Sequence, residues 1–279
     1  MKKGLYCKYD SGFSLEKSVA ALRVYIPTKL GYVNYNVAHA VHSEIFCDTW
    51  RLSHAFACDD NFENEYCLNP SAEWDMALRI QDRDDFIGGQ LHGDEIFSSV
   101  KFFIDGVQKE ITCFAELTAF NVLTIEVESV GLDPSDHKTE VLKHFKKYVI
   151  NADGVAVEQR VEWLGDYLLT SCYLAMMPPF KEFTDSYYTD IDTEVKRITV
   201  SDFAVKNCKS ATLFGEKSGL LFRMSVPKYP SYETGNQLLV SDNRGRPYNK
   251  MYFSVCRSAS VRCGEIWESR TEYVIQNGV

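Results

Sequence analysis

Short runs rich in Val, Ile, Phe, Tyr and Thr recur along the chain between turn-forming residues, a pattern typical of a β-sandwich or β-barrel. Asn151-Ala152-Asp153-Gly154 fits the turn of a hairpin between two such runs. Helical patterns are confined to 15–21 and 139–147, and the second also fits a strand. The runs predict strands at 22–26, 50–58, 74–80, 86–92, 100–104, 122–130, 146–150, 155–163, 211–214, 220–226, 237–240, 250–256 and 266–275.

One turn-rich stretch, residues 131–136, could separate two domains, but the strand pattern continues on both sides of it without a change in composition. A hydrophobic content of 45%, with 13% aromatic residues, is ample for one large core. We therefore predict an all-β fold with few short helices, a single sandwich domain over 1–279.

The acidic charge balance narrows the choice of partners. The formal net charge is -9 and the isoelectric point is near 5.2, which argues against a general nucleic-acid or anionic-membrane binder. A local basic cleft can coexist with an acidic exterior, and Arg244 and Arg246 in the turn 243–247 form the best positive patch. We therefore expect no nucleic-acid partner and leave an anionic sugar open.

The cysteines and the N-terminus bear on localisation. Nine cysteines without a CxxC pair indicate neither a zinc ribbon nor a complete disulfide framework, and we expect mostly buried thiols in a reducing compartment. The basic start of the chain is not followed by an apolar run of signal-peptide length, and no stretch approaches a membrane span. The sequence as given predicts a cytoplasmic protein, with a secreted or virion-associated one as the alternative.

The most informative local feature is Gln90-Leu91-His92, which follows Gly88-Gly89 and precedes Gly93. On a strand, residues two apart point to the same face, so the Gln90 amide and the His92 imidazole would project together. An amide that binds a carboxylate, next to a titratable base, suits proton abstraction beside a carboxyl group. The glycines leave room for a bulky ligand.

This segment resembles the Gln-(Ile/Val)-His strand motif of alginate-lyase-like polysaccharide lyases. Those enzymes are β-jelly rolls whose active site lies across a concave sheet. An upstream Arg strand and a C-terminal Tyr-Phe-Lys-Ala-Gly-x-Tyr motif of that family have partial counterparts at 50–53 and 252–258. Here Ser254 replaces the lysine and Ser258 stands where the family has its catalytic tyrosine.

The resemblance implies that the single domain is a β-jelly roll, a concanavalin-like β-sandwich. It also implies cleavage of a uronic-acid-containing glycan by β-elimination. A base removes the proton next to the carboxylate, and an acid protonates the leaving glycosidic oxygen. Gln90 and Arg51 would stabilise the enolate charge, His92 would be the base, and Tyr252 would be the acid.

Alternation along 250–255 supports the choice of Tyr252. Lys250, Tyr252 and Ser254 would share one polar face of a strand, and Met251, Phe253 and Val255 the other. We expect an anionic polysaccharide or oligosaccharide as partner. The residues expected to bind it are Lys250, Arg244, Arg246, Trp50 and Tyr248.

Two other classes of function stay open. Asp94-Glu95 could bind calcium or serve in glycoside hydrolysis, although adjacent strand residues face opposite ways, and 59–61 is a calcium-loop fragment. We otherwise expect no metal or cofactor. A non-catalytic carbohydrate-binding or virion module is the third class, because jelly rolls serve lectins and capsids as well as enzymes. A lyase needs Gln90, His92, an arginine and a tyrosine to meet in one groove.

Overall fold

The computed structural model describes residues 3–89, 91–199, 203–233, 235 and 237–278. In this part of the chain, strands dominate, and the helices are three short 3-10 segments, Ser43–Ile45, Ile111–Phe114 and Lys181–Phe183. None of these helices is long and apolar enough to cross a membrane. The predicted all-β sandwich with few short helices is confirmed.

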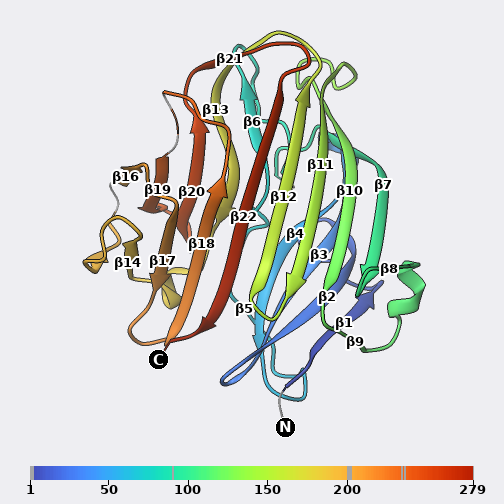
Figure 1. Ribbon diagram of the computed structural model, residues 1–279, viewed down its shortest axis with the longest axis vertical. Coiled ribbons are helices and arrows are strands. Elements are labelled where there is room, and N and C mark those ends of the chain that lie inside the picture. Colours follow the sequence, from blue (N-terminus) through green and yellow to red (C-terminus); the bar gives the residue numbers. More distant parts are fainter. Residues whose placement is uncertain (1–2, 90, 200–202, 234, 236, 279) are drawn as a thin grey trace.

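The front layer in Figure 1 is a row of long antiparallel strands. Its inner face is apolar because burial alternates along the strands, as in Gly154–Trp163. The strands, in spatial order, are β7 (Glu95–Ile104), β10 (Leu123–Leu132), β11 (Glu140–Asn151), β12 (Gly154–Trp163), β22 (Ile266–Asn277), β18 (Leu220–Lys228), β17 (Ser210–Phe214), β14 (Ser186–Thr189) and β15 (Lys196–Arg197).

The same sheet continues past β7 through a short parallel pairing of Glu95 with Cys47 and Ile96 with Asp48. From there it runs through β4 (Cys47–Cys58), β3 (Gly31–His42), β2 (Ser18–Thr28), β1 (Leu5–Asp10) and β9 (Thr118–Phe120), with β5 (Tyr66–Cys67) beside β4 and β8 (Val107–Lys109) beside β7.

A second sheet carries much of the pocket described below. Its described strands are β16 (Phe203–Lys206), β19 (Gln237–Asp242), β20 (Asn249–Cys256), β13 (Tyr167–Met177), β21 (Ala259–Val261) and β6 (Ala77–Ile80). Contacts from β12 and β22 join it to the front layer. Gln159 Nε2 donates to Leu174 O at 2.6 Å, and Met176 N donates to Tyr273 OH at 3.3 Å.

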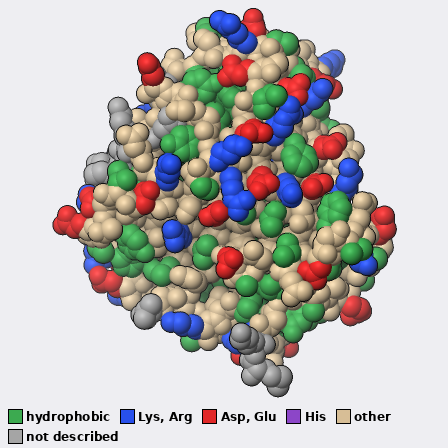
Figure 2. Space-filling view, viewed as in Figure 1, with side chains coloured by type: hydrophobic (Ala, Val, Ile, Leu, Met, Phe, Trp, Pro, Cys, Tyr) green, Lys and Arg blue, Asp and Glu red, His purple; other side chains and the backbone are tan. Residues whose placement is uncertain are grey.

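The outer face of the front layer carries charges of both signs, as Figure 2 shows. Cross-strand registers place Lys101, Glu126, Lys147, Glu158 and Arg270 in one row across five strands, so that the sign alternates from strand to strand. Opposite charges directly across a ladder stabilise the pairing. We call these five residues the charged row.

Some predicted elements are corrected by the structure. The helix expected at 15–21 does not form, because Ser18 already begins β2, and 139–147 lies mostly in β11, the strand alternative. Over the described residues of 86–92, the expected strand is reduced to one bridge between Leu78 and Ile87. The hairpin is confirmed, since Asn151 pairs with Gly154. Most cysteines are buried, and all nine are free thiols.

A group of polar side chains is buried where β7, β11 and β4 meet. Glu95 Oε1 lies 2.9 Å from Lys146 Nζ and 3.1 Å from His144 Nδ1, and it accepts a hydrogen bond from Ser129 Oγ at 2.8 Å. Lys146 Nζ also donates to Thr49 Oγ1 on β4 at 3.1 Å. We call these five residues the buried ion cluster; all are at most 4% exposed.

The cluster holds Glu95 ionised inside the protein. Burial alone would raise the pKa of Glu95, but the Lys146 ammonium and the His144 imidazole together hold this pKa well below its usual range. Glu95 lies on β7, whereas His144 and Lys146 lie on β11, and Lys146 also contacts Thr49 on β4. The cluster therefore links the front layer to β4.

Replacing the buried ammonium should be costly. Lys146→Met leaves Glu95 without its closest cation, and we expect the free energy of unfolding to fall by about 3–5 kcal/mol. Urea denaturation measures this loss. Lys147→Met, on the outer face of the same strand, is the matched control and should change stability by less than about 1 kcal/mol. Similar small losses in both variants would contradict the role given to the cluster.

Candidate functional site

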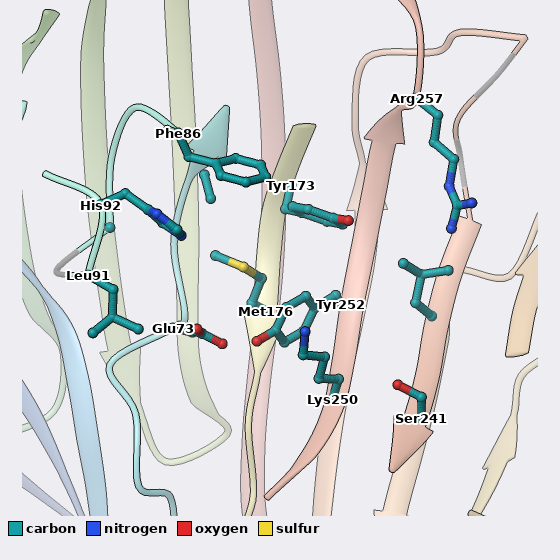
Figure 3. A pocket seen from close by; sticks show the side chains of 13 residues that line it. Glu73, Phe86, Leu91, His92, Tyr173, Met176, Ser241, Lys250, Tyr252 and Arg257 are labelled. Atoms are coloured by element: carbon teal, nitrogen blue, oxygen red, sulfur yellow. The ribbon is translucent and has the colours of Figure 1, made fainter. Parts of the chain in front are cut away.

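A pocket of about 340 Å³ opens between the turn 85–94, the segment around Glu73 and the second sheet (Figure 3). This volume lies near the low end of the range for small-molecule sites. Its lining combines apolar and aromatic side chains with a few polar ones: Glu73, Ala77, Phe86, Gly89, Leu91, His92, Tyr173, Met176, Leu239, Ser241, Lys250, Tyr252 and Arg257.

The turn that carries His92 is built on glycines. Gly88, Gly89 and Gly93 have φ values of 85°, 82° and 80°, a region that favours glycine and ends the strand. The turn is closed by hydrogen bonds from Gly88 N to Gly93 O at 2.8 Å and from Gly93 N to Gly89 O at 3.0 Å. Gln90, predicted as a catalytic residue, lies outside the described residues.

His92 is oriented by a carboxylate. Its Nδ1 lies 2.6 Å from Asp85 Oδ1, and a carboxylate accepts, so Nδ1 carries the proton in this bond. Its ring also packs on Phe86, with centroids 4.9 Å apart. Figure 3 shows the imidazole pointing into the pocket. With Nδ1 engaged, Nε2 is the nitrogen left to exchange a proton with a ligand.

A second imidazole–carboxylate pair supports the turn from behind. His137 Nδ1 lies 2.7 Å from Asp94 Oδ1, and the His137 ring stacks on Phe46 at 4.3 Å. Asp94 is 2% exposed, and burial raises its pKa, which the bond to His137 opposes. Asp94 N also donates to Ile45 O at 2.8 Å. The turn is therefore held firmly where it enters β7.

Glu73 supplies the carboxyl group of the pocket. It is half-buried, and its Oε2 has no hydrogen-bond partner among the described residues. Burial raises the pKa of Glu73, although the ammonium of Lys250 partly counteracts this. Figure 3 shows the carboxylate pointing into the pocket, toward Tyr252 and Lys250. Glu73 was not among the predicted site residues; its only signal in the sequence is its place beside a predicted strand.

Lys250 and Tyr252 come from β20 and face the pocket together. Met251 and Phe253 face the core, so the predicted alternation along this strand is observed. The Tyr252 hydroxyl is buried and has no partner among the described residues. Lys250 Nζ lies 5.2 Å from the centroid of the Tyr252 ring. The structure thus brings His92, Tyr252 and Lys250 into one pocket.

Aromatic rings form a continuous wall of the pocket. Tyr173 lies between Phe86, at 6.3 Å between centroids, and Tyr252, at 5.6 Å. Such rings offer flat apolar faces at low cost in side-chain entropy, which suits stacking on a sugar ring.

Two of the predicted substrate contacts do not reach the pocket. Arg51 is fully buried, and its Nη2 donates to Ala72 O at 3.1 Å. Trp50 is 5% exposed and stacks on His39 at 5.2 Å. The expectation that both touch substrate is corrected, because β4 is covered on both faces. The Arg51 guanidinium lies under the turn, beside Gly89.

The other predicted contacts lie near the pocket without lining it. Arg244 and Arg246 are exposed in the connection between β19 and β20. Tyr248 is 9% exposed and forms a bridge with Phe180, and burial raises its pKa to about 12, with a smaller effect of the Glu73 charge. These three residues do not complete the predicted site.

The candidate calcium ligands are engaged elsewhere. Asp59 accepts hydrogen bonds from the backbone N–H groups of Asn61 and Glu63 and from the Asn64 side chain. Asp94 and Glu95 each have their own imidazole or ammonium partner. Over the described ranges, no group of three or more His, Cys, Asp or Glu residues could hold a metal ion.

Comparisons with known proteins give likeness of overall architecture alone. No family model and no curated protein matches the chain. A galactose mutarotase-like protein from Clostridium acetobutylicum is 10% identical with a TM-score of 0.47, and the match covers 99% of this chain and 100% of that one. A GH36 α-galactosidase from Geobacillus stearothermophilus is 9% identical with a TM-score of 0.47, covering 99% of this chain.

The chain spans only 41% of the length of that α-galactosidase. A putative aldose 1-epimerase from Escherichia coli K12 is 9% identical with a TM-score of 0.35, and the match covers 91% of this chain and 99% of that one.

The position of the turn can be tested with two glycines of similar backbone geometry. A Cβ at Gly93 would lie 1.8 Å from Ile45 O, whereas at Gly106, with φ of 82°, nothing lies within 4 Å. We expect Gly106→Ala to lower the free energy of unfolding by about 1–2 kcal/mol, because alanine is strained in the left-handed backbone conformation. Gly93→Ala should cost about 1–3 kcal/mol more because of the overlap. If urea denaturation showed the same decrease in the free energy of unfolding for Gly93→Ala and Gly106→Ala, the packing of Gly93 against Ile45 would be contradicted.

The charge coupling in the pocket can be measured directly. Because the Lys250 ammonium lowers a pKa that burial raises, Lys250→Met should raise the pKa of Glu73 further. The Glu73 carboxyl signal, assigned with Glu73→Gln, can be titrated by ¹³C NMR. Lys217→Met, at an exposed site, is the control. If the titration midpoint of Glu73 were the same in Lys250→Met as in the wild type, the Glu73 carboxyl group and the Lys250 ammonium would not be coupled.

Proposed function

We propose that this protein is an enzyme that acts on an acidic sugar by proton transfer. The observation that carries the proposal is the meeting in one pocket of an Asp85-oriented imidazole, a half-buried carboxyl group, a tyrosine hydroxyl without a partner among the described residues, and an ammonium. Groups that can take and give a proton around one small cavity suit general acid–base catalysis. The aromatic wall suits a sugar ring.

The reaction we propose first is β-elimination at a uronic acid. Nε2 of His92 takes the proton from the carbon next to the carboxylate, and the Lys250 ammonium stabilises the charge that develops there. Lys250 takes the place we expected for Arg51, which is buried. The leaving glycosidic oxygen receives a proton from Tyr252 or from Glu73, whose raised pKa keeps its acid form to higher pH.

A second candidate reaction is the interconversion of sugar anomers. It needs one group to remove a proton from a hydroxyl and another to protonate the ring oxygen, and no glycosidic bond is broken. The volume of about 340 Å³ favours this candidate, since the pocket suits a short ligand. His92 and Glu73 would be the proton-transferring pair.

Glycoside hydrolysis fits the pocket less well. A hydrolase of the usual kind places two carboxyl groups about the glycosidic bond. Among the described lining residues, Glu73 is the only one with a carboxyl group. A non-catalytic sugar-binding module needs the same aromatic rings but no proton transfer. Rate measurements therefore distinguish such a module from an enzyme.

The first test is a rate measurement on uronic-acid oligosaccharides, read from the ultraviolet absorbance of the unsaturated product. We expect turnover by the wild type and a decrease of about 100- to 10,000-fold in His92→Ala, the range of a lost acid–base group. A decrease of the same size in either Tyr252→Phe or Glu73→Gln would identify the acid. His42→Ala, an imidazole outside the pocket, is the control and should leave the rate unchanged.

The same proteins can be tested for anomer exchange by NMR magnetisation transfer between the two anomeric signals of a free uronic acid. Exchange without elimination would select the second candidate. Binding with neither reaction would overturn the proposal of an enzyme and leave a binding module.

A further inference from the structure

The pocket has two halves. Glu73, His92, Lys250 and Tyr252 gather in one half, which holds the groups that can transfer a proton or stabilise charge. Figure 3 shows Arg257 and Ser241 on the other side, beyond Tyr173. The second half has no acid–base pair among its described residues, yet it contains a guanidinium.

The guanidinium of Arg257 is not neutralised within the described part of the chain. Several arginines pair with carboxylates, such as Arg83 with Asp133 at 2.6 Å and Arg270 with Glu158 at 2.8 Å, whereas Arg223 and Arg262 have no such pair among the described residues. No such pair and no hydrogen bond involves the described side chain of Arg257, although the chain carries 39 acidic residues against 30 basic ones. An exposed arginine at a pocket, with no carboxylate partner among the described residues, is suited to an anionic ligand.

The second half is fixed relative to the first by the pairing of β19 with β20. Leu239 pairs with Tyr252, and Ser241 pairs with Lys250. Leu239 and Ser241 are 8% and 2% exposed, so both are set into the sheet. A ligand that crosses from one half to the other would therefore meet a preformed surface and not one that must be ordered on binding.

We propose that Tyr173, Leu239, Ser241 and Arg257 form a second subsite, which binds an acidic group on the unit attached to the reacting sugar. This inference rests on the proposed function, since the reacting sugar is the one beside His92 and Glu73. The guanidinium provides two parallel donors for a carboxylate or a phosphate, and the Tyr173 ring and Leu239 cover the apolar face of the second unit. The ligand is then an acidic disaccharide or a sugar with a phosphate substituent.

Binding of ligands that differ in one feature tests the subsite. Isothermal titration calorimetry would compare galacturonic acid, digalacturonic acid and galacturonic acid 1-phosphate on the wild type, Arg257→Met and Arg257→Lys. We expect at least one of the two-charge ligands to bind the wild type about 10-fold or more tightly than the monomer, the effect of a charge-assisted hydrogen bond. Whichever ligand shows the gain identifies the acidic group.

Arg257→Met should abolish that gain and leave monomer binding unchanged, while Arg257→Lys should keep part of it because the charge remains but the paired donors are lost. Arg262→Met, at another exposed arginine just past β21, is the matched control. Both Met variants should unfold at the wild-type temperature, since neither side chain is buried.

Two results would overturn the subsite. The first is that Arg257→Met still binds the two-charge ligand more tightly than the monomer. The second is that Arg257→Met loses the same affinity for the monomer as for the two-charge ligands, which would place Arg257 on the reacting sugar itself. Either result leaves the proposed function intact if His92→Ala still abolishes turnover. Failure of every acidic sugar to bind the wild type would instead remove the proposed function together with the subsite.

Discussion

The fold depends on charges that are taken out of water and matched inside the sandwich. Lys146 on the front layer meets Glu95 at the first residue of β7, and the same ammonium reaches Thr49 on β4. Desolvating an ammonium and a carboxylate is expensive, and only close contacts with good partners offset that cost. The position of β7 relative to β11 and β4 is therefore fixed by polar contacts that tolerate little displacement, unlike apolar packing alone.

This constraint extends to the pocket through the chain itself. Glu95 is preceded by Asp94, which is held by His137, and by Gly93, which is packed against the Ile45 carbonyl. The turn with His92 therefore starts from an anchored end. A catalytic side chain on a loop needs such support, because small displacements of a proton-transferring group are costly for catalysis. The anchoring groups lie behind the turn, where a ligand does not touch them.

Sequence patterns predicted the sheet better than the site. Alternation identified most long strands and the correct face of β20, because burial on one side imposes a period of two. It failed at 86–92, where β-forming residues precede glycines in the left-handed region. Arg51 was expected in the pocket because a sequence does not reveal that β4 is covered on both faces. Glu73 escaped notice because its pocket is assembled by strands distant in sequence.

The charged row on the outer face has a consequence for how the strands find their partners. Apolar alternation rejects a slip of one residue, which would turn the core side chains outward, but a slip of two residues keeps them inside. In the native register Glu158 faces Arg270 and Arg160 faces Glu268. Moving β22 by two residues along β12 in one direction would place Arg160 opposite Arg270 and Glu158 opposite Glu272. Moving it in the other direction would place Glu158 opposite Glu268. At the pairing of β12 with β22, surface charges thus disfavour a misalignment that the hydrophobic core would accept.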